Sequence, residues 1–276
     1  MRALLLLLLA LGGVTAVLGS ATAAAQGMVA SFFAAHRGGA LLWPENSLLA
    51  FRNALALGVD YLELDVHLSR DGEVVVIHDP TLDRTTTGRG PVREHTLAEL
   101  QGLRLRDRDG TVTEEPVPTL EQVVALAAAG KRQMLLEIKL DAGRRRYPDI
   151  EEKVLAILDR QRFTPFAVVM AFEAETWRRV RELRPDARAG ALYSARQLPA
   201  AAVDGELQAL RAAGVAFVGL NQATVNAEVA TKVRLAGLTL GVWTVNERDA
   251  IERFLAQGVS VVITDRPDLA KELLGR

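Results

Sequence analysis

The chain of 276 residues contains no cysteine, only 5 % aromatic residues and almost no net charge. Without cysteine it can form no disulfide scaffold, thiol nucleophile or thiolate zinc site. Its 33 basic and 34 acidic residues give a formal net charge of −1, and the lack of a basic surplus argues against nucleic acid as a partner. Hydrophobic residues make up 49 % of the chain, which excludes a disordered protein.

The first 35 residues carry a single charge, that of Arg2. An apolar run over residues 4–9 follows it, and small residues fill positions 20–25. This order is typical of an export signal, so we expect a signal peptide over residues 1–25 and an exported protein, periplasmic or secreted. The alternative is an uncleaved membrane anchor, since an uncharged stretch of this length could span a bilayer. After cleavage we expect no stable membrane insertion.

From residue 28 onward, short apolar runs alternate with amphipathic stretches. The apolar runs predict nine strands, over residues 29–35, 61–67, 73–78, 134–139, 166–171, 188–193, 215–220, 240–245 and 259–264. The amphipathic stretches predict helices over residues 47–57, 120–129, 150–160, 174–183, 200–212, 227–236 and 248–256. This alternation is typical of parallel strands joined by helical crossovers. No linker divides residues 26–276, which we therefore interpret as a single domain.

Two of the nine strands lie too close in sequence to be parallel neighbours. The segment between residues 61–67 and 73–78 ends in Asp71-Gly72, which is a strong hairpin signal, and a parallel crossover needs about a dozen residues. Residues 73–78 are therefore predicted to return antiparallel, which leaves eight strands for a (β/α)₈ TIM barrel. If Asp71 and Gly72 are the two loop residues, Asp65 pairs with His78.

Residues 80–118, after this hairpin, do not follow the barrel pattern. They are polar and contain one short helical pattern, over residues 97–103. An irregular segment of this length is usually functional, so we interpret it as an insertion over the barrel mouth. The alternative is a tolerated surface loop.

Three carboxylates are expected at the carboxyl ends of two barrel strands, where such barrels carry their reactive groups. Glu63 and Asp65 share one strand face, and Glu137 lies on the next barrel strand. Buried carboxylates need a compensating cation, and an oxygen-rich cluster suits one Mg²⁺ or Ca²⁺ ion. The alternative is ion pairing with Arg37 or Lys139 and no metal.

Two of the four histidines, His36 and His78, end predicted strands beside these carboxylates. Both could reach a phosphodiester held there and act as general base and general acid. His67 is interpreted as a rim residue, one step further out. Arg37 and Lys139 would bind an anionic substrate.

The segment Glu45-Asn46-Ser47 opens a predicted helix, either as a cap or as a group at the barrel mouth.

Read in order, these residues resemble the glycerophosphodiester phosphodiesterase family. The resemblance runs from residue 29 to the C-terminus and rests on eight short motifs. The motifs are His36-Arg37-Gly38, Glu45-Asn46-Ser47, Glu63-Leu64-Asp65-Val66, Val76-Ile77-His78-Asp79, Pro118-Thr119-Leu120-Glu121, Glu137-Ile138-Lys139, Trp243-Thr244-Val245-Asn246 and Thr264-Asp265-Arg266-Pro267.

The resemblance implies a TIM barrel that hydrolyses glycerophosphodiesters to sn-glycerol 3-phosphate and an alcohol with Ca²⁺ or Mg²⁺. It implies three kinds of site residue. These are the metal ligands Glu63, Asp65 and Glu137, the acid/base pair His36 and His78, and the substrate contacts Arg37, Glu45, Asn46, Lys139 and Trp243. The nucleophile is water or the neighbouring hydroxyl of the substrate, which would form a cyclic phosphate.

Three other functions compete with this one. A glycosidase also uses paired carboxylates in a barrel, but it leaves Arg37, Lys139 and both histidines without a role. A non-catalytic exported phosphodiester-binding protein would need the pocket alone. A lysophospholipase D-like enzyme would cleave larger lipid headgroups.

Overall fold

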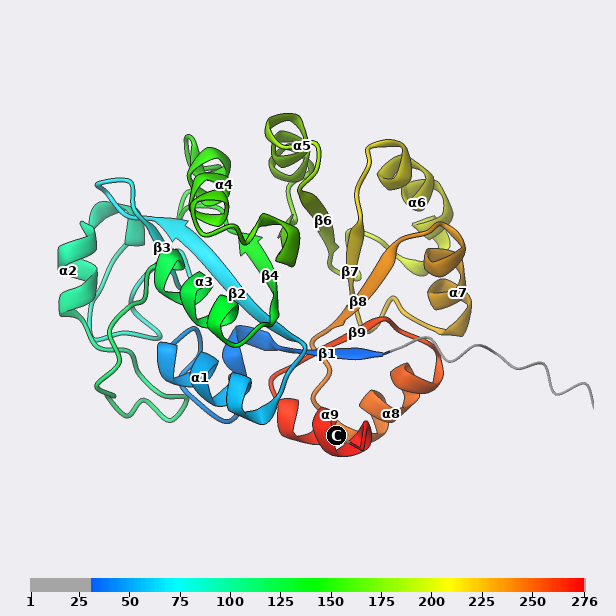
Figure 1. Ribbon diagram of the computed structural model, residues 1–276, viewed down its shortest axis with the longest axis horizontal. Coiled ribbons are helices and arrows are strands. Elements are labelled where there is room, and N and C mark those ends of the chain that lie inside the picture. The colour runs from blue at the N-terminus through cyan, green and yellow to red at the C-terminus, as the bar shows by residue number, and fades with distance from the viewer. Residues whose placement is uncertain (1–30, 276) are drawn as a thin grey trace, which may run out of the picture.

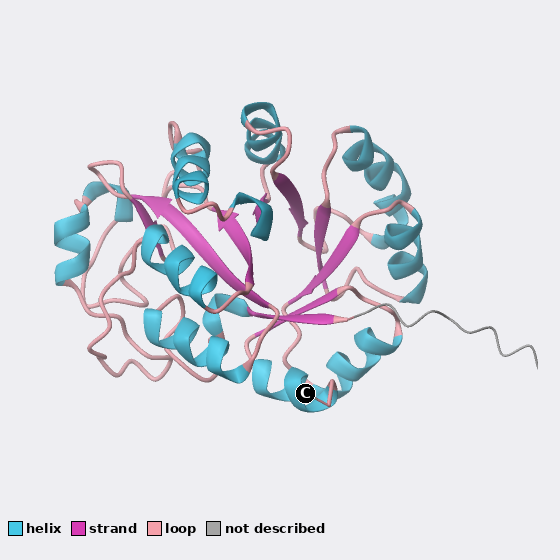
Figure 2. Cartoon of the chain, in the orientation of Figure 1, coloured by secondary structure: helices cyan, strands magenta, loops and turns pink. Residues whose placement is uncertain are grey.

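A closed barrel of eight parallel strands, surrounded by helices, forms the body of the protein. The computed structural model describes residues 31–275 (Figure 1), and the predicted signal peptide lies outside this range. Figure 2 shows the strands inside and the helices around them. The barrel strands are β1 (Phe32–Ala35), β2 (Tyr61–Leu68), β4 (Gln133–Ile138), β5 (Ala167–Ala171), β6 (Arg188–Tyr193), β7 (Phe217–Asn221), β8 (Thr239–Trp243) and β9 (Val261–Thr264).

The strands pair in the order β1-β9-β8-β7-β6-β5-β4-β2, and a pairing between β1 and β2 closes the ring. This confirms the predicted (β/α)₈ barrel. The outer helices are α1 (Leu48–Leu57), α3 (Leu120–Ala129), α4 (Ile150–Arg160), α5 (Ala174–Leu183), α6 (Val203–Ala212), α7 (Ala227–Leu235), α8 (Arg248–Ala256) and α9 (Pro267–Leu273). The sequence patterns missed α9. Among residues 31–275, no helix is both long and apolar enough to cross a bilayer.

Alternating side chains separate two cores. Leu62, Leu64 and their equivalents on other strands point outward into the large core under the helices, as period-two patterning requires. A smaller core fills the barrel interior around Phe217. The Phe217 ring packs directly against the backbone of β8, because a Cβ on Gly241 would lie 2.3 Å from the ring. The bottom of the barrel is thus apolar, and polar groups collect at the other end.

The hairpin of β2 with β3 (Val74–Val76) exists, but its predicted register is wrong by one residue. His67 pairs with Val75, and the Asp65 carbonyl accepts from Ile77 rather than facing His78. The reason lies in the turn, which has three loop residues and not two: Ser69 pairs with Glu73 through a backbone hydrogen bond of 2.9 Å. Gly72 has φ +81°, as expected for a type I turn that ends in a left-handed residue.

Residues 80–118 pack on the outer face of this hairpin. They include α2 (Leu97–Gly102) and short bridges such as Thr86 with Leu105. A third core, formed by Val75 and Ile77 of the hairpin with Leu82, Leu100 and neighbouring apolar residues, holds the insertion in place. Arg84 and the segment 106–108 of the insertion consequently line a groove beside the barrel mouth.

Candidate active site

The three predicted carboxylates form one buried cluster. Glu63 and Asp65 lie on β2 and Glu137 on β4, with Asp65 directly opposite Glu137 in the parallel register. One oxygen from each lies within 4.8 Å of the others, and the three residues are at most 7 % exposed. Because β2 and β4 are neighbours in the barrel wall, the fold sets the distances between the three carboxylates.

Two positively charged side chains lie against this cluster but do not pair with all of its oxygen atoms. The Lys139 ammonium is 2.6 Å from Glu137 Oε1 and 3.6 Å from Asp65 Oδ1, and Arg37 Nε is 3.6 Å from Asp65 Oδ2. Asp65 Oδ1 is buried and accepts no hydrogen bond from residues 31–275. Burial, together with the neighbouring Asp65, raises the pKa of Glu63 to about 8. The ion pairs left open as an alternative are therefore present. The three sets of carboxyl oxygens still suit a divalent cation, which would displace the proton of Glu63 on binding.

His36 follows β1 in a sharp turn. Arg37 and Gly38 have positive φ values of 53° and 84°, and a Cβ on Gly38 would lie 2.7 Å from that of Ala50, so glycine lets the turn pack on α1. His36 Nδ1 lies 2.6 Å from Asp265 Oδ1, and Nε2 lies 4.0 Å from Glu63. Burial would lower the pKa of His36, but Glu63 and Asp265 outweigh it and raise the pKa.

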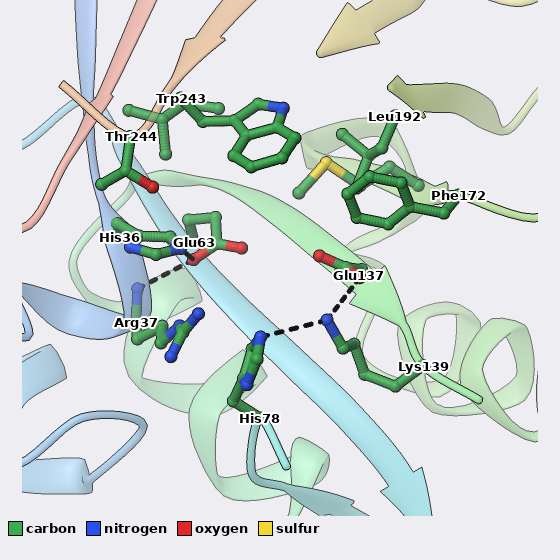
Figure 3. Close-up of a pocket in the computed structure, with 12 residues that line it drawn as sticks. His36, Arg37, Glu63, His78, Glu137, Lys139, Phe172, Leu192, Trp243 and Thr244 are labelled. Atoms are coloured by element: carbon green, nitrogen blue, oxygen red, sulfur yellow. Dashed lines mark hydrogen bonds and ion pairs between the residues drawn. The ribbon is translucent and has the colours of Figure 1, made fainter. Parts of the chain in front are cut away.

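His78 lies just beyond β3 and lines the same pocket beside Lys139 (Figure 3). Its Nδ1 lies 2.7 Å from Asp79 Oδ1 and its Nε2 lies 3.2 Å from the Lys139 ammonium. Because Asp79 only accepts when ionised, Nδ1 carries the proton, and Nε2 is left as the atom that faces the pocket. The two imidazoles thus have the same arrangement, with Nδ1 bound to an aspartate and Nε2 turned inward.

The predicted substrate contacts Arg37, Glu45 and Asn46 hold one another in place. The Arg37 backbone N–H donates to Glu63 at 2.8 Å, and its guanidinium donates to Glu45 at 3.1 Å. Asn46 donates to Asp65 at 3.0 Å. Ser47 is the N-cap of α1 and accepts from the Ala50 backbone. The segment therefore serves both as a cap and as part of the site.

Arg84, from the insertion, connects Glu45 with Asp79, the partner of His78. Its guanidinium donates to the two oxygens of Glu45 at 2.7 and 2.8 Å. It donates to the two oxygens of Asp79 at 2.7 and 3.0 Å. A continuous chain of polar contacts therefore runs from Arg37 through Glu45, Arg84 and Asp79 to His78. Arg84 was not predicted, because nothing in its sequence context distinguishes it from other arginines of the insertion.

An apolar wall completes the pocket opposite the charged groups (Figure 3). Trp243 and Phe172 meet edge to face with ring centroids 5.6 Å apart, and Leu192 lies beside them. The pocket has about 480 Å³ of empty space and also contacts His36, His78 and Lys139. Trp243 thus lines the pocket, as predicted from the family resemblance.

His67 is not the rim residue that was predicted. It is fully buried, with Nδ1 2.9 Å from the Tyr147 hydroxyl and Nε2 3.0 Å from the His78 carbonyl. Burial lowers its pKa to about 4. The insertion and the loop after β4 cover this end of β2, which strand alternation alone could not show, and His67 holds the backbone at His78.

Two aspartates were noted only as motif or strand-end residues, although they orient the histidines. Asp265 follows β9, and Asn246 donates to its second oxygen at 2.7 Å. Asp79 follows His78 directly. The signal for both was their position at a strand end beside the site. The contact of Asp265 with His36 forms only when the barrel is closed, whereas Asp79 contacts its neighbour in the sequence.

Comparison with known proteins agrees with this geometry. The sequence model of the glycerophosphoryl diester phosphodiesterase family matches residues 36–269. A glycerophosphodiester phosphodiesterase of Caldanaerobacter subterraneus is 34 % identical over 235 residues, covering 85 % of this chain and 93 % of the relative. One from Bacillus subtilis is 31 % identical and covers 97 % of this chain and 96 % of its own length.

Solved structures show the same fold. A putative glycerophosphoryl diester phosphodiesterase from Agrobacterium tumefaciens has a TM-score of 0.80 at 29 % identity, covering 88 % of this chain and 97 % of its own. An Oleispira antarctica phosphodiesterase in complex with the product sn-glycerol-3-phosphate has a TM-score of 0.76 at 25 % identity, covering 90 % and 98 %. The chain described here belongs to the glycerophosphoryl diester phosphodiesterase family.

Proposed function

We propose that the protein hydrolyses glycerophosphodiesters to sn-glycerol 3-phosphate and an alcohol, with a divalent cation and with His36 and His78 as general acid and base. One observation carries the proposal. Two imidazoles, each bound to an aspartate through Nδ1, line one pocket together with a buried carboxylate cluster. The product in the Oleispira relative is the glycerol phosphate expected here.

Glu63, Asp65 and Glu137 would hold the cation, and we propose Ca²⁺ or Mg²⁺ because these hard ions prefer carboxylate oxygens. When bound, the cation supplies positive charge beside the phosphate. Arg37 and Lys139 add donors from the protein for the phosphate oxygens, Arg37 as a fork and Lys139 as a point charge. Trp243 and Phe172 enclose the glycerol carbons.

The histidines move the protons. One imidazole accepts a proton at Nε2 from the nucleophile as that oxygen bonds to phosphorus, and the other donates its Nε2 proton to the leaving alkoxide as the phosphorus–oxygen bond breaks. Asp79 and Asp265 stabilise the charged imidazole rings. The nucleophile is water or the neighbouring glycerol hydroxyl. In the second case a cyclic phosphate forms and is then opened by water.

The test measures glycerol phosphate released from glycerophosphocholine by the metal-loaded and the chelated protein. We expect activity only with metal, and a loss of about 10²- to 10⁴-fold in His36→Ala and His78→Ala. His95→Ala is the matched control, because His95 lies in the insertion and contacts the Arg89 carbonyl outside the pocket. Full activity in either site variant contradicts the assignment.

Two parallel measurements address the competing functions. Product formed in a single turnover excludes a protein that only binds phosphodiesters. Lysophosphatidylcholine, offered alongside glycerophosphocholine, tests the lysophospholipase D-like alternative, which predicts that the lipid is the better substrate. We also propose that the protein acts outside the cytoplasm after removal of residues 1–25, which peptide sequencing of the mature N-terminus would test.

A further inference from the structure

A second hollow adjoins the active site on the side of the insertion. This groove, which we call the headgroup groove, is formed by Arg84, Thr85 and residues 106–108 of the insertion against His36 and Arg37 of the barrel. It has about 920 Å³ of empty space, against about 480 Å³ for the pocket lined by Trp243 and Phe172. His36, Arg37 and Thr244 line both hollows. A phosphate at Arg37 would therefore border both hollows.

The charges of the groove are unequally neutralised. Glu45 is paired with Arg37 and Arg84, and Asp265 with His36. These acidic groups are thus already compensated.

Two arginines of the same wall have no carboxylate partner among residues 31–275. Arg106 donates only to the carbonyls of Thr86 and Gly110, and Arg108 has no side-chain partner there. Asp107, between them, accepts from the Arg108 backbone and is the one acidic group of this wall without an ion pair. The wall therefore keeps a net charge of +1.

A buried threonine belongs to the same wall. Thr85 is 6 % exposed, and its hydroxyl has no hydrogen-bond partner among the described residues. Buried hydroxyls are usually satisfied. Its neighbour Thr86, in contrast, donates to the Leu82 carbonyl at 2.7 Å.

We propose that the headgroup groove binds the leaving alcohol and selects headgroups that carry an additional negative charge. This inference rests on the proposed phosphodiesterase function and specifies its substrate class. The glycerol side of the substrate lies against the apolar wall of Trp243 and Phe172, the phosphate lies at Arg37, and an anionic headgroup extends toward Arg106 and Arg108. A cationic headgroup such as choline meets the same arginines and is disfavoured.

Three glycerophosphodiesters test the selection. The headgroup of bis(glycerophospho)glycerol carries a second phosphodiester anion, that of glycerophosphoglycerol is neutral, and that of glycerophosphocholine is cationic. We expect kcat/KM, counted per scissile phosphodiester at low salt, to fall in that order. The anionic substrate should exceed the cationic one by about tenfold, as one hydrogen bond to a charged group provides.

Arg108→Gln is the main variant. Arg106 is less suitable, because it also donates to two backbone carbonyls of the insertion and its loss could disturb the local structure. Arg108→Gln should lower kcat/KM for the anionic substrate about tenfold while changing that for glycerophosphocholine little or raising it. Arg89→Gln makes the same charge change at an exposed arginine of the insertion that does not line the groove, and should leave the order intact.

The outcomes separate the two proposals. Equal cleavage of the three substrates, a preference for choline, or the same change in both variants overturns the headgroup inference alone. If none of the three substrates is cleaved, the proposed function fails, and this inference fails with it.

Discussion

Replacing Arg84 with methionine should slow catalysis although the residue lies in the insertion. The substitution removes the two donors that hold Glu45 and the two that hold Asp79. Among the described residues, only His78 then holds Asp79, and the orientation of the imidazole is fixed less firmly. Hydrogen bonds to charged groups contribute about 1.5–3 kcal/mol, and the low end applies because the Arg84 side chain is 49 % exposed.

We expect kcat to fall by about tenfold, which corresponds to about 1.4 kcal/mol of barrier. KM should rise less, through the loosened contact between Glu45 and Arg37. Arg84→Lys should restore only part of kcat, because an ammonium cannot hold two carboxylates in a fixed plane. Arg89→Met is the matched control. An unchanged kcat in Arg84→Met, while His78→Ala is inactive, would refute a positioning role.

The same variant has a pH signature in stability. Burial opposes ionisation of Asp79, but the hydrogen bonds from His78 and Arg84 outweigh it and lower its pKa. A carboxyl whose pKa is lowered on folding stabilises the protein above its ordinary pKa of about 3.9, and this stabilisation is lost as the pH falls toward the folded value. The difference in urea midpoint between wild type and Arg84→Met should therefore be larger at pH 7 than at pH 3.

Three further predictions address other parts of the site and the barrel. Asp265→Asn should lower kcat about tenfold to a hundredfold through loss of the charged partner of His36, with KM and the melting temperature nearly unchanged. Because the pKa of Glu63 is raised to about 8 without metal, cation binding should release a proton at pH 7, and affinity should increase with pH up to about 8. Calorimetry in buffers of different ionisation enthalpy measures this proton, and its absence contradicts the assignment. Gly241→Ala should destabilise the protein by about 1–3 kcal/mol in urea unfolding, since the added Cβ collides with Phe217.

Residues fixed by strand periodicity were the easiest to predict. The placement of Glu63, Asp65 and Glu137 on one face follows from the alternation of side chains in two neighbouring parallel strands. The register between such strands is fixed, because a slip by one residue would turn every side chain to the other face. The hairpin was less determined. Asp71-Gly72 correctly predicted a turn, but the same dipeptide fits two-residue and three-residue loops. The difference of one loop residue changed the residue that pairs with Asp65.

Contacts made by the insertion could not be predicted from the chain. Arg84 and the burial of His67 depend on how residues 80–118 pack against the hairpin, and this packing is set by a small core of scattered apolar residues. The local pattern of apolar and polar residues does not indicate which distant segments come into contact. His78 nevertheless reached the predicted pocket despite the wrong register, because it lies beyond the last pair of the β2–β3 ladder.

The pairing of His36 with Asp265 joins the beginning of the barrel to its end. His36 follows the first strand and Asp265 the last, so their contact forms only when β9 takes its place beside β1. A ribosome must therefore finish nearly the whole polypeptide before this histidine–aspartate pair can exist. Shortened translation products or fragments clipped ahead of residue 265 would lack it, however well their earlier strands had assembled.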